Sequence, residues 1–508
     1  MSRGLFVSLY KKGKPFTLID CRERRDFVNG HWFGSINIPL SRLTENSTKL
    51  LPDNGFPIHF LDWQDKPSKE SLRKLNFLGY RNILPEKTDY PDKIGDGFVK
   101  GEYVWSKAFG EVIGDNSNIP EITPSMFISD YKDAQLFDVR PNDEYQKFTL
   151  PGSINLPNSQ LLASYGALSK SKKMVLLHCA GRTRSIIGAN TLKASGYKGK
   201  LAIFRGGTQA WQLAGYQREL QAGKSFSKKT ESSYVVEEFL NKWKIPYEKS
   251  SSIDIREFQR SNRGNLIFDV SDDNADCQIV DQGLLKVSGT TLIQQTDQSI
   301  GCFHMPIVLF DLGSGSRAAF SAYWLKLMGF QVRVIILEEA PIIPRSQKPF
   351  SETLDENCPA KILDLCQLYQ SEVQFDFRPS QEFEKRHLKG SRWKNLSKIL
   401  SERPFIKKIG IVAESKISGS EICGTLTRLG WNIFGYYCWN ETEINKIDLS
   451  QCKLNQPIDR SSLFEGRHNG NLKDAQNYLD WEEKLPESID PFIHDMWVTY
   501  FNRKPKEH

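Results

Sequence analysis

The sequence predicts an α/β protein of tandem domains, each a mostly parallel sheet flanked by helices. A short apolar strand that ends in Asp recurs along the chain and is the first observation behind this prediction. The four copies read LIDCR (18–22), LFDVR (136–140), IFDVS (267–271) and QFDFR (374–378). Their Asp residues are 107 to 131 residues apart. Such a period fits whole domains and is too long for the units of a solenoid.

A glycine followed by an aromatic residue repeats in the same register and is the second observation. The pairs are Gly79-Tyr80, Gly196-Tyr197, Gly329-Phe330 and Gly430-Trp431. Each pair begins 54 to 60 residues after the Asp of its own copy. The shared spacing indicates four copies of one structural plan.

The second copy shows the order of elements most clearly. MVLLH (174–178) is an apolar strand, Ser185 to Ala194 has helical character with Gly196 as a stop, and LAIF (201–204) is the next strand. Strand, helix and strand at this spacing predict a parallel sheet with helices packed on it. Binding sites in such sheets lie at the carboxyl ends of strands, which is where residue 179 falls.

The repeat divides the chain into four copies and a tail. Charge, Ser and Pro concentrate around 85–118, 221–250 and 340–368, which we interpret as linkers. The predicted domains are 1–110, 119–220, 251–340 and 368–445, followed by a helical tail at 446–508. Within the tail, 472–485 has the pattern of an amphipathic helix that packs back on a domain.

Composition limits the classes of function. The 508 residues carry a net charge of +7, from 68 basic and 61 acidic residues without a dense basic run, so we expect no nucleic-acid or membrane partner. We find no apolar run long enough to span a membrane and no secretory signal in the sequence. We therefore expect a cytoplasmic protein. The nine Cys and eight His form neither a disulfide framework nor metal-ligand spacing, so we expect no metal or organic cofactor.

One loop has the residues for nucleophilic chemistry. It reads HCAGRTRS (178–185). Cys179 would lie between a strand end and a helix start, where backbone N–H groups and the helix dipole attract an anion and should lower the pKa of the thiol. Arg182 and Arg184 add positive charge, and the small Ala180 and Gly181 leave the sulfur accessible.

These motifs together resemble a rhodanese domain over residues 120–220. The resemblance rests on LFDVR, PGSINLP (151–157), the Cys179 loop and FRGGTQAWQLAGY (204–216). It implies a sulfurtransferase of the thiosulfate sulfurtransferase type, in which Cys179 accepts a sulfane sulfur as a persulfide and passes it to a thiol or cyanide-like acceptor. It also implies the residues that bind the sulfur and its small anionic donor: Ala180, Gly181, Arg182, Thr183 and Arg184.

The sequence departs from this family at one turn. Rhodaneses often have Gly-His before the Ile-Pro-Gly segment, as the first copy does at Gly30-His31, but the second copy has Phe148 and Thr149 there. Since the Cys179 loop is intact, we expect this change to affect a structural turn more than the chemistry.

The other three copies lack the thiol. Alignment on the repeated glycine places Asp62 opposite Cys179 in the first copy. The third copy has Asp311 or Leu312 at this position, and the fourth has Ala413 or Glu414. We interpret these copies as inactive packing partners that shape access to Cys179, so the chain resembles a bacterial multidomain sulfurtransferase with one active cysteine.

Two other functions stay open. A phosphatase or arsenate reductase of related fold has a Cys-x5-Arg loop, whereas Arg184 is at Cys+5 and the loop is one residue short. A non-catalytic persulfide carrier or sensor would use the same thiol. We assign fold roles to Asp138, Arg140 and His178, since strand alternation points His178 away from Cys179.

Overall fold

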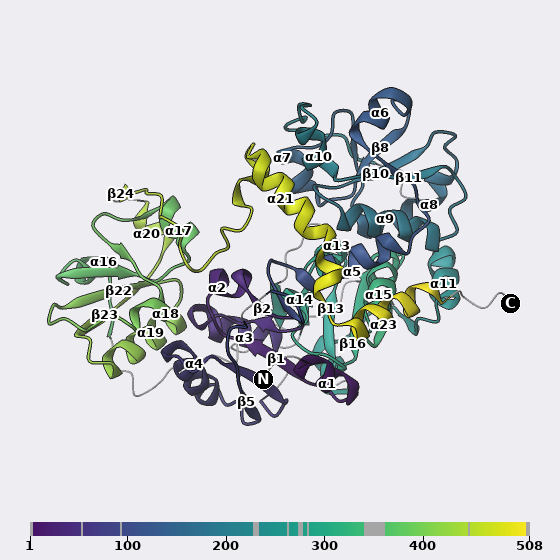
Figure 1. The fold of residues 1–508 in the computed structure, drawn as a ribbon. Coiled ribbons are helices and arrows are strands. Elements are labelled where there is room, and N and C mark those ends of the chain that lie inside the picture. The colour runs from purple at the N-terminus through teal and green to yellow at the C-terminus, as the bar shows by residue number, and fades with distance from the viewer. Residues whose placement is uncertain are drawn as a thin grey trace.

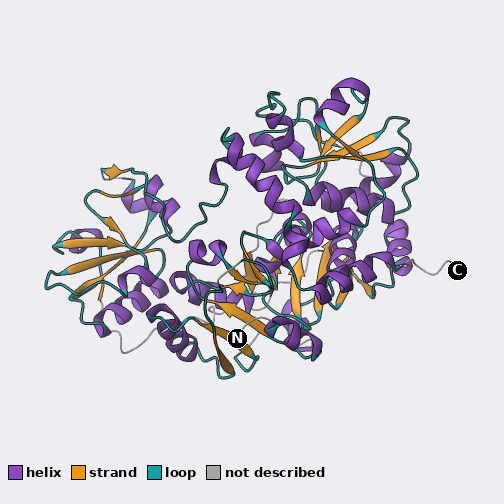
Figure 2. Cartoon of the chain, in the orientation of Figure 1, coloured by secondary structure: helices purple, strands orange, loops and turns teal. Residues whose placement is uncertain are grey.

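The computed structural model describes residues 4–51, 54–91, 94–226, 233–261, 264–272, 278–281, 284–339, 361–445 and 448–503. Four sheets of four to six strands follow one another along the chain, each with helices packed against it (Figures 1 and 2). Strand pairing within these sheets is parallel, apart from one antiparallel pair in the third. The α/β fold class predicted from the sequence is therefore confirmed.

The first sheet has the strand order β3-β1-β4-β5. Its strands are β1 (Thr17–Asp20), β3 (Ile36–Asn37), β4 (Ile58–Asp62) and β5 (Ile83–Lys87). Its helices are α1 (Leu5–Lys11), α2 (Arg24–Asn29), α3 (Leu43–Leu50) and α4 (Lys66–Phe77), with the short 3-10 turn η1 (Leu40–Arg42). A separate two-stranded ribbon joins β2 (His31–Trp32) to β6 (Phe98–Val99).

The second sheet has the order β7-β11-β10-β8-β9 and contains the predicted nucleophile strand at its centre. Its strands are β7 (Glu121–Ile122), β8 (Gln135–Asp138), β9 (Ile154–Asn155), β10 (Val175–His178) and β11 (Leu201–Phe204). Its helices are α6 (Pro124–Asp130), α7 (Asn142–Lys147), α8 (Leu161–Ser169), α9 (Thr183–Ala194) and α10 (Gly207–Leu213), with η2 (Asn158–Gln160). The predicted strands at 174–178 and 201–204 and the helix ending at Ala194 are confirmed.

The third sheet has the order β12-β17-β16-β13-β15-β14. Its strands are β12 (Tyr247–Ser250), β13 (Leu266–Asp269), β14 (Gln278–Asp281), β15 (Leu284–Lys286), β16 (Ile307–Leu312) and β17 (Val332–Leu337). Its helices are α11 (Ser233–Lys242), α12 (Ile255–Ser261), α13 (Gly289–Gln294), α14 (Thr296–Ser299) and α15 (Ser316–Leu327).

The fourth sheet has the order β18-β23-β22-β19-β21. Its strands are β18 (Lys361–Ile362), β19 (Val373–Asp376), β21 (Arg392–Trp393), β22 (Ile409–Ala413) and β23 (Ile433–Cys438), and a ribbon pairs β20 (His387–Leu388) with β24 (Leu449–Ser450). Its helices are α16 (Leu365–Leu368), α17 (Ser380–Lys385), α18 (Leu396–Ile399), α19 (Lys416–Arg428) and α20 (Glu441–Ile444). Most of the expected linker at 340–368 lies outside the described residues.

The expected linker at 85–118 contains instead a buried helix, α5 (Val104–Asp115). The linker interpretation is wrong here because every residue of α5 from Val104 to Ile113 is buried, and Trp105, Phe109 and Val112 are among them. Trp497 of the tail packs edge-on against the rings of Trp105 and Phe109, at centroid distances of 5.1 and 5.2 Å. Helix α5 thus lies between the domains as part of their shared core.

The tail forms η4 (Glu465–His468), α21 (Leu472–Glu483), α22 (Leu485–Ser488) and α23 (Pro491–Asn502). The predicted amphipathic helix is α21, and it packs against α10 and α5. Figure 1 shows it in yellow beside α10, where it joins the far end of the chain to the second domain.

The copies pack in pairs through equivalent loops. The second and third meet where Thr290 at the start of α13 donates to Ser159 Oγ at 3.1 Å and accepts from Ser159 N at 3.2 Å. The first and fourth meet at the matching place, where the buried Glu23 carboxylate accepts from Ser41 Oγ at 2.7 Å and Ser397 Oγ at 2.5 Å. The copy that contains Cys179 therefore packs against a copy that has no cysteine at the equivalent position.

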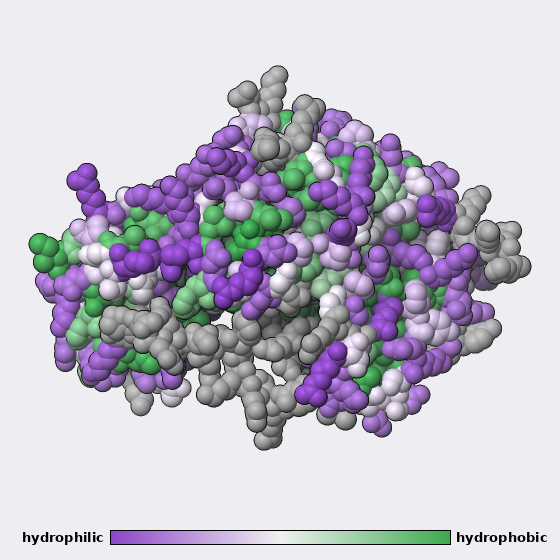
Figure 3. Space-filling view, turned by 90° about the horizontal axis from the view of Figure 1, so that it is seen from below, coloured by the Kyte–Doolittle hydropathy of each residue, from purple (hydrophilic) through white to green (hydrophobic). Residues whose placement is uncertain are grey.

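The face seen in Figure 3 mixes polar and apolar residues. None of the described helices combines the length and the apolar character that crossing a bilayer requires.

Candidate functional site

Cys179 lies directly after β10, at the carboxyl end of a central strand of the second sheet. Helix α9 begins four residues later at Thr183, so a short loop separates the thiol from a helix N-terminus. The side chain is only 2% exposed. It lines a cavity of about 630 Å³ together with the whole predicted loop from Ala180 to Arg184.

Backbone hydrogen bonds join the start of α10 to the loop that carries Cys179. Thr208 N donates to Cys179 O at 3.0 Å, and Gln209 N donates to Ala180 O at 3.1 Å. Gly207 makes this approach possible: its φ is +53°, and a Cβ there would lie 2.1 Å from Cys179 O. The glycine pair at 206–207 therefore fixes the backbone that carries the thiol.

Burial dominates the electrostatics of the thiol. It raises the pKa of Cys179, while the charge of Arg184 and hydrogen bonds from Ser185 lower it and Glu482 raises it further. Cys179 Sγ lies 3.8 Å from Ser185 Oγ. The expectation of a lowered pKa is wrong for this structure because the thiol is enclosed by protein, and that penalty on the charged form outweighs the nearby cation.

Arg184 is fixed by Glu144 of α7. Its Nη1 and Nη2 reach the two carboxylate oxygens at 2.5 and 2.9 Å. Burial raises the pKa of Glu144, but the charge and hydrogen bonds of Arg184 outweigh this effect and lower the pKa to about 2. Arg184 therefore supplies positive potential to the cavity while Glu144 engages two of its five N–H donors.

Arg182 is engaged even more completely. Its guanidinium forms ion pairs with Glu111 at 2.8 Å, Glu121 at 3.4 Å and Glu483 at 3.1 Å. These carboxylates come from α5, β7 and α21, so the side chain joins three elements. The sequence offers Arg182 as a donor-binding residue, and the structure places it in a structural network at the cavity wall.

The tail contributes cavity residues that sequence reasoning missed, and Tyr478 and Glu482 lie against the Cys179 loop. Glu482 of α21 accepts from Thr183 Oγ1 at 2.6 Å and from Arg182 N at 3.3 Å. A Cβ on Gly181 would lie 2.7 Å from Glu482 Oε2 and 2.9 Å from Tyr478 Cε1, which explains why the loop has glycine there. Some 300 residues separate these groups along the chain, so no local motif indicates them.

Two further cavity residues come from α5 and α10. Lys107 Nζ lies 3.6 Å from Glu482 Oε1 and also contacts the Tyr478 hydroxyl. Burial lowers the pKa of Lys107, which Glu482 opposes. Gln209 is buried, and neither of its amide atoms has a hydrogen-bond partner among the described residues.

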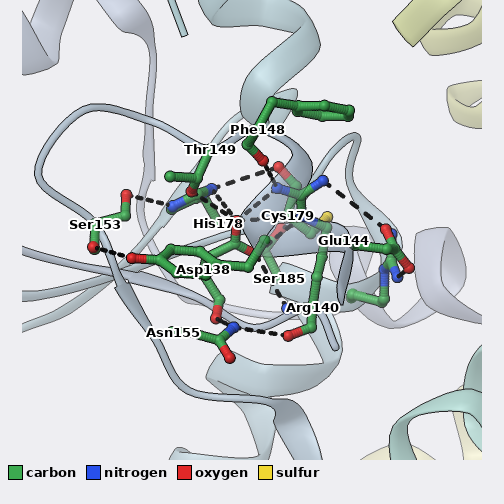
Figure 4. Close-up of polar contacts among 12 residues, drawn as sticks. Asp138, Arg140, Glu144, Phe148, Thr149, Ser153, Asn155, His178, Cys179 and Ser185 are labelled. Carbon is green, nitrogen blue, oxygen red and sulfur yellow. Dashed lines mark hydrogen bonds and ion pairs between the residues drawn. The ribbon is translucent and has the colours of Figure 1, made fainter. Parts of the chain in front are cut away.

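Asp138, Arg140 and His178 form a buried polar group behind the loop (Figure 4). Arg140 Nη2 donates to Asp138 Oδ2 at 2.7 Å, and Thr149 Oγ1 donates to the same oxygen at 2.7 Å. His178 Nε2 lies 2.8 Å from Ser153 Oγ. Thr149, which stands where the family often has His, thus takes part in a structural hydrogen bond.

The same Asp-Arg pair recurs at Asp20-Arg22 and Asp376-Arg378. Each Arg also donates to a backbone carbonyl after the next helix, namely Phe148 O in the second copy and the equivalent Gly30 O and Arg386 O. Because copies without the thiol keep this arrangement, it holds the strand end and the following turn together.

Strand register identifies the residues opposite Cys179 in the other copies. In the second sheet the repeated Asp138 pairs with His178, and Cys179 is the next residue. In each other sheet, the residue equivalent to Cys179 therefore follows the residue that pairs with the repeated Asp. In the third and fourth sheets Asp269 pairs with Phe310 and Asp376 with Val412. The equivalents are therefore Asp311 and Ala413, not Leu312 or Glu414. Extending the register of β1 and β4 by one pair gives Asp62 in the first copy.

Comparison with known proteins identifies the family of the second copy. A sequence model described as "Rhodanese-like domain" matches residues 126–214. The chain is also 32% identical over 90 residues to the uncharacterized protein YqhL of Bacillus subtilis, covering 18% of this chain and 70% of that protein.

The chain belongs to the rhodanese-like family.

Two more similarities extend this result. The putative sulfur carrier protein YrkF of Bacillus subtilis is 27% identical over 120 residues, which cover 21% of this chain and 64% of YrkF, so the chain spans under two thirds of that relative. The crystal structure of thiosulfate sulfurtransferase from Pseudomonas aeruginosa shares the fold along 97% of both chains, with a TM-score of 0.77 and 22% identity. The rhodanese-like fold thus extends beyond the matched domain.

Within the described residues of this rhodanese-like chain, no three His, Cys, Asp or Glu side chains are grouped so that they would hold a metal ion.

Proposed function

We propose that the chain is a sulfurtransferase that moves a sulfane sulfur from an anionic donor to a thiol or cyanide-like acceptor through a persulfide on Cys179. The observation that carries this proposal is the position of Cys179. Its side chain, although buried, lines a cavity at a strand end, beside the N-terminus of α9. A small anion in this cavity can reach the sulfur, and the helix dipole offsets part of the cost that burial imposes on the thiolate.

The reaction has two displacement steps. In the first, the Cys179 thiolate attacks the outer sulfur of the donor and forms an S–S bond, while the donor's own S–S bond breaks. With thiosulfate as the donor, sulfite leaves with the electron pair. In the second, the acceptor attacks the outer sulfur of the persulfide and the Cys179 thiolate leaves. Sulfane sulfur changes partners, and no external oxidant or reductant is consumed.

The loop supports both steps by holding negative charge. We assign this role to the backbone of Ala180, Gly181, Thr183 and Arg184, since Arg182 N donates to Glu482 in this structure. Arg184 acts through its positive charge, which lowers the pKa of Cys179. Arg182 contributes by fixing the loop to its neighbours.

We propose the division of labour that the sequence predicts: an active domain at 119–220, three domains without a cysteine at the position of Cys179, and a tail at 446–508. The predicted domains at 251–340 and 368–445 extend toward the N-terminus, because β12 belongs to the third sheet and β18 to the fourth. The carboxylates at Asp62 and Asp311 would repel an anionic donor. The tail then has a catalytic setting, because Tyr478 and Glu482 line the cavity of the active domain.

A persulfide carrier is the second candidate function. It is favoured by the similarity to YrkF, whose name describes a putative sulfur carrier protein. A carrier would accept sulfur once and release it to a partner protein, whereas an enzyme would turn over with small acceptors. No observation favours the phosphatase alternative, and the short loop before α9 argues against it.

The experiment is intact-protein mass spectrometry after incubation with thiosulfate, on the wild type and Cys179→Ser. One added sulfur in the wild type that cyanide removes and that the variant lacks is the expected result. Steady-state thiocyanate formation then separates enzyme from carrier. An unmodified wild type after incubation with thiosulfate and with an organic persulfide would overturn the proposal.

A further inference from the structure

The cavity beside Cys179 is much larger than a small inorganic donor needs. Its volume of about 630 Å³ falls in the range of pockets that bind drug-sized organic molecules, about 300–1,000 Å³. Seven cationic side chains and three carboxylates line it, so the lining favours an anionic ligand. Which cations are available for a ligand depends on their existing partners.

Most of these cations already have a carboxylate partner. Arg182 and Arg184 are in the ion pairs described above, Arg140 is paired with Asp138, and Lys107 with Glu482. Lys147 is exposed and lies 3.4 Å from Asp143. Arg218 and Arg467 have no carboxylate partner within the described residues, and they differ from the other cations in this respect.

Both arginines are held in place by aromatic rings and backbone carbonyls. Arg218 lies 4.2 Å from the centroid of the Phe148 ring and donates to His468 O at 3.0 Å. Arg467 lies 4.8 Å from the Tyr478 ring and donates to Phe464 O at 3.0 Å. A guanidinium has five N–H donors, so most of them stay available at each arginine.

The N–H donors of Arg218 and Arg467 that have no partner are partly shielded from water. Arg467 Nε is buried, with no hydrogen-bond partner among the described residues. Burial and the positive charge of Arg140 lower the pKa of Arg218. The neighbouring His468 is kept neutral, since burial and the charges of Arg467, Arg140 and Arg184 lower its pKa to about 3. Placing cations together in a low-dielectric cavity is costly, and a bound anion would offset that cost.

We propose that Arg218 and Arg467 form a second anion subsite that binds a carboxylate at the far end of an organic persulfide donor. This inference rests on the function proposed above and names the donor class for the same cavity. The donor's outer sulfur would reach Cys179 while its carboxylate is held by the two arginines. The Cys179 thiolate forms an S–S bond with that sulfur, the donor S–S bond breaks, and the donor leaves as its thiolate.

The test uses the full-length protein with two donors, glutathione persulfide and thiosulfate. The rate of Cys179 persulfide formation is measured by mass spectrometry for the wild type, Arg218→Gln, Arg467→Gln and the control Lys473→Gln, which changes an exposed charge of α21 outside the cavity. Loss of one charge-assisted contact is expected to slow loading from glutathione persulfide by about tenfold. Loading from thiosulfate should change less than twofold, and Lys473→Gln should behave as wild type with both donors.

A binding measurement separates the subsite from the sulfur chemistry. In the Cys179→Ser background, calorimetry with glutathione as an inert probe is expected to show weaker binding for Arg218→Gln and Arg467→Gln than for Lys473→Gln. Equal loading by all variants, or an equal loss with both donors, would overturn the subsite and leave the proposed function standing. If neither donor forms a persulfide on wild-type Cys179, the proposed function is overturned. If Arg218→Gln and Arg467→Gln also bind glutathione as tightly as the control, the subsite is overturned as well.

Discussion

Glu482 of the C-terminal tail accepts a hydrogen bond of 2.6 Å from the hydroxyl of Thr183, the first residue of α9. The carboxylate thereby lies on the loop that carries Cys179, although its helix is at the other end of the chain. A negative charge at this point opposes formation of the thiolate. The tail therefore tunes the site electrostatically as well as covering it.

Replacing Glu482 with Gln is expected to lower the pKa of Cys179, because Glu482 is one of the groups that raise it. The pH profile of iodoacetamide alkylation should move to lower pH in Glu482→Gln. Asp480→Asn is the matched control, since that residue is exposed on the same helix. A profile that moves to higher pH, or equally in both variants, would contradict this role.

Replacing Arg184 with Gln is expected to have the opposite effect. The charge of Arg184 lowers the pKa of Cys179, so its removal should move the alkylation profile to higher pH and slow persulfide formation by about tenfold or more. Lys193→Gln changes a charge at the exposed far end of the same helix and should leave both readouts unchanged. If the two variants behave alike, Arg184 has no electrostatic part in loading.

The packing of the tail on α5 can be tested through stability. Trp497 is fully buried against Trp105 and Phe109, so Trp497→Ala should destabilise this region by about 3–5 kcal/mol through the cavity it leaves. Thr499→Ala, which is exposed on the same helix, should have little effect. Urea unfolding followed by fluorescence and circular dichroism would measure the difference, and near-identical midpoints for both variants would refute it.

The local parts of the site could be predicted from the sequence, because they depend on a few consecutive residues. The four strands end at the repeated Asp as predicted, and Cys179 lies between a strand and a helix. The glycine alignment placed Asp62 correctly, but strand register was needed to choose Asp311 and Ala413 in the other copies.

The long-range parts could not be predicted. The partners of Arg182 come from α5, β7 and α21, and no spacing rule connects these segments. Helix α5 lies in a stretch where charge, Ser and Pro are concentrated, a composition that favours a linker, and its burial becomes visible only in the structure. The pKa of Cys179 was expected to fall because the sequence shows the nearby cations, while the degree of enclosure becomes visible only in three dimensions.

His178 should make the protein less stable as the pH falls. Burial lowers its pKa from 6.5 to about 4, so at pH values between these two the unfolded chain binds a proton that the folded site does not. Its contribution to stability is complete above pH 6.5 and falls as the pH approaches 4, with a maximum loss of about 3 kcal/mol.

The measurement for His178 is urea unfolding at several pH values between 7 and 4, for the wild type and His178→Gln. The buried His31 and the partly buried His468 also have lowered pKa values, so the wild type alone cannot isolate one histidine. The difference between the two proteins should shrink as the pH falls, because the variant lacks the titrating group but keeps a polar side chain opposite Ser153. A difference that stays constant across this range would show that His178 is protonated equally in the folded and unfolded states.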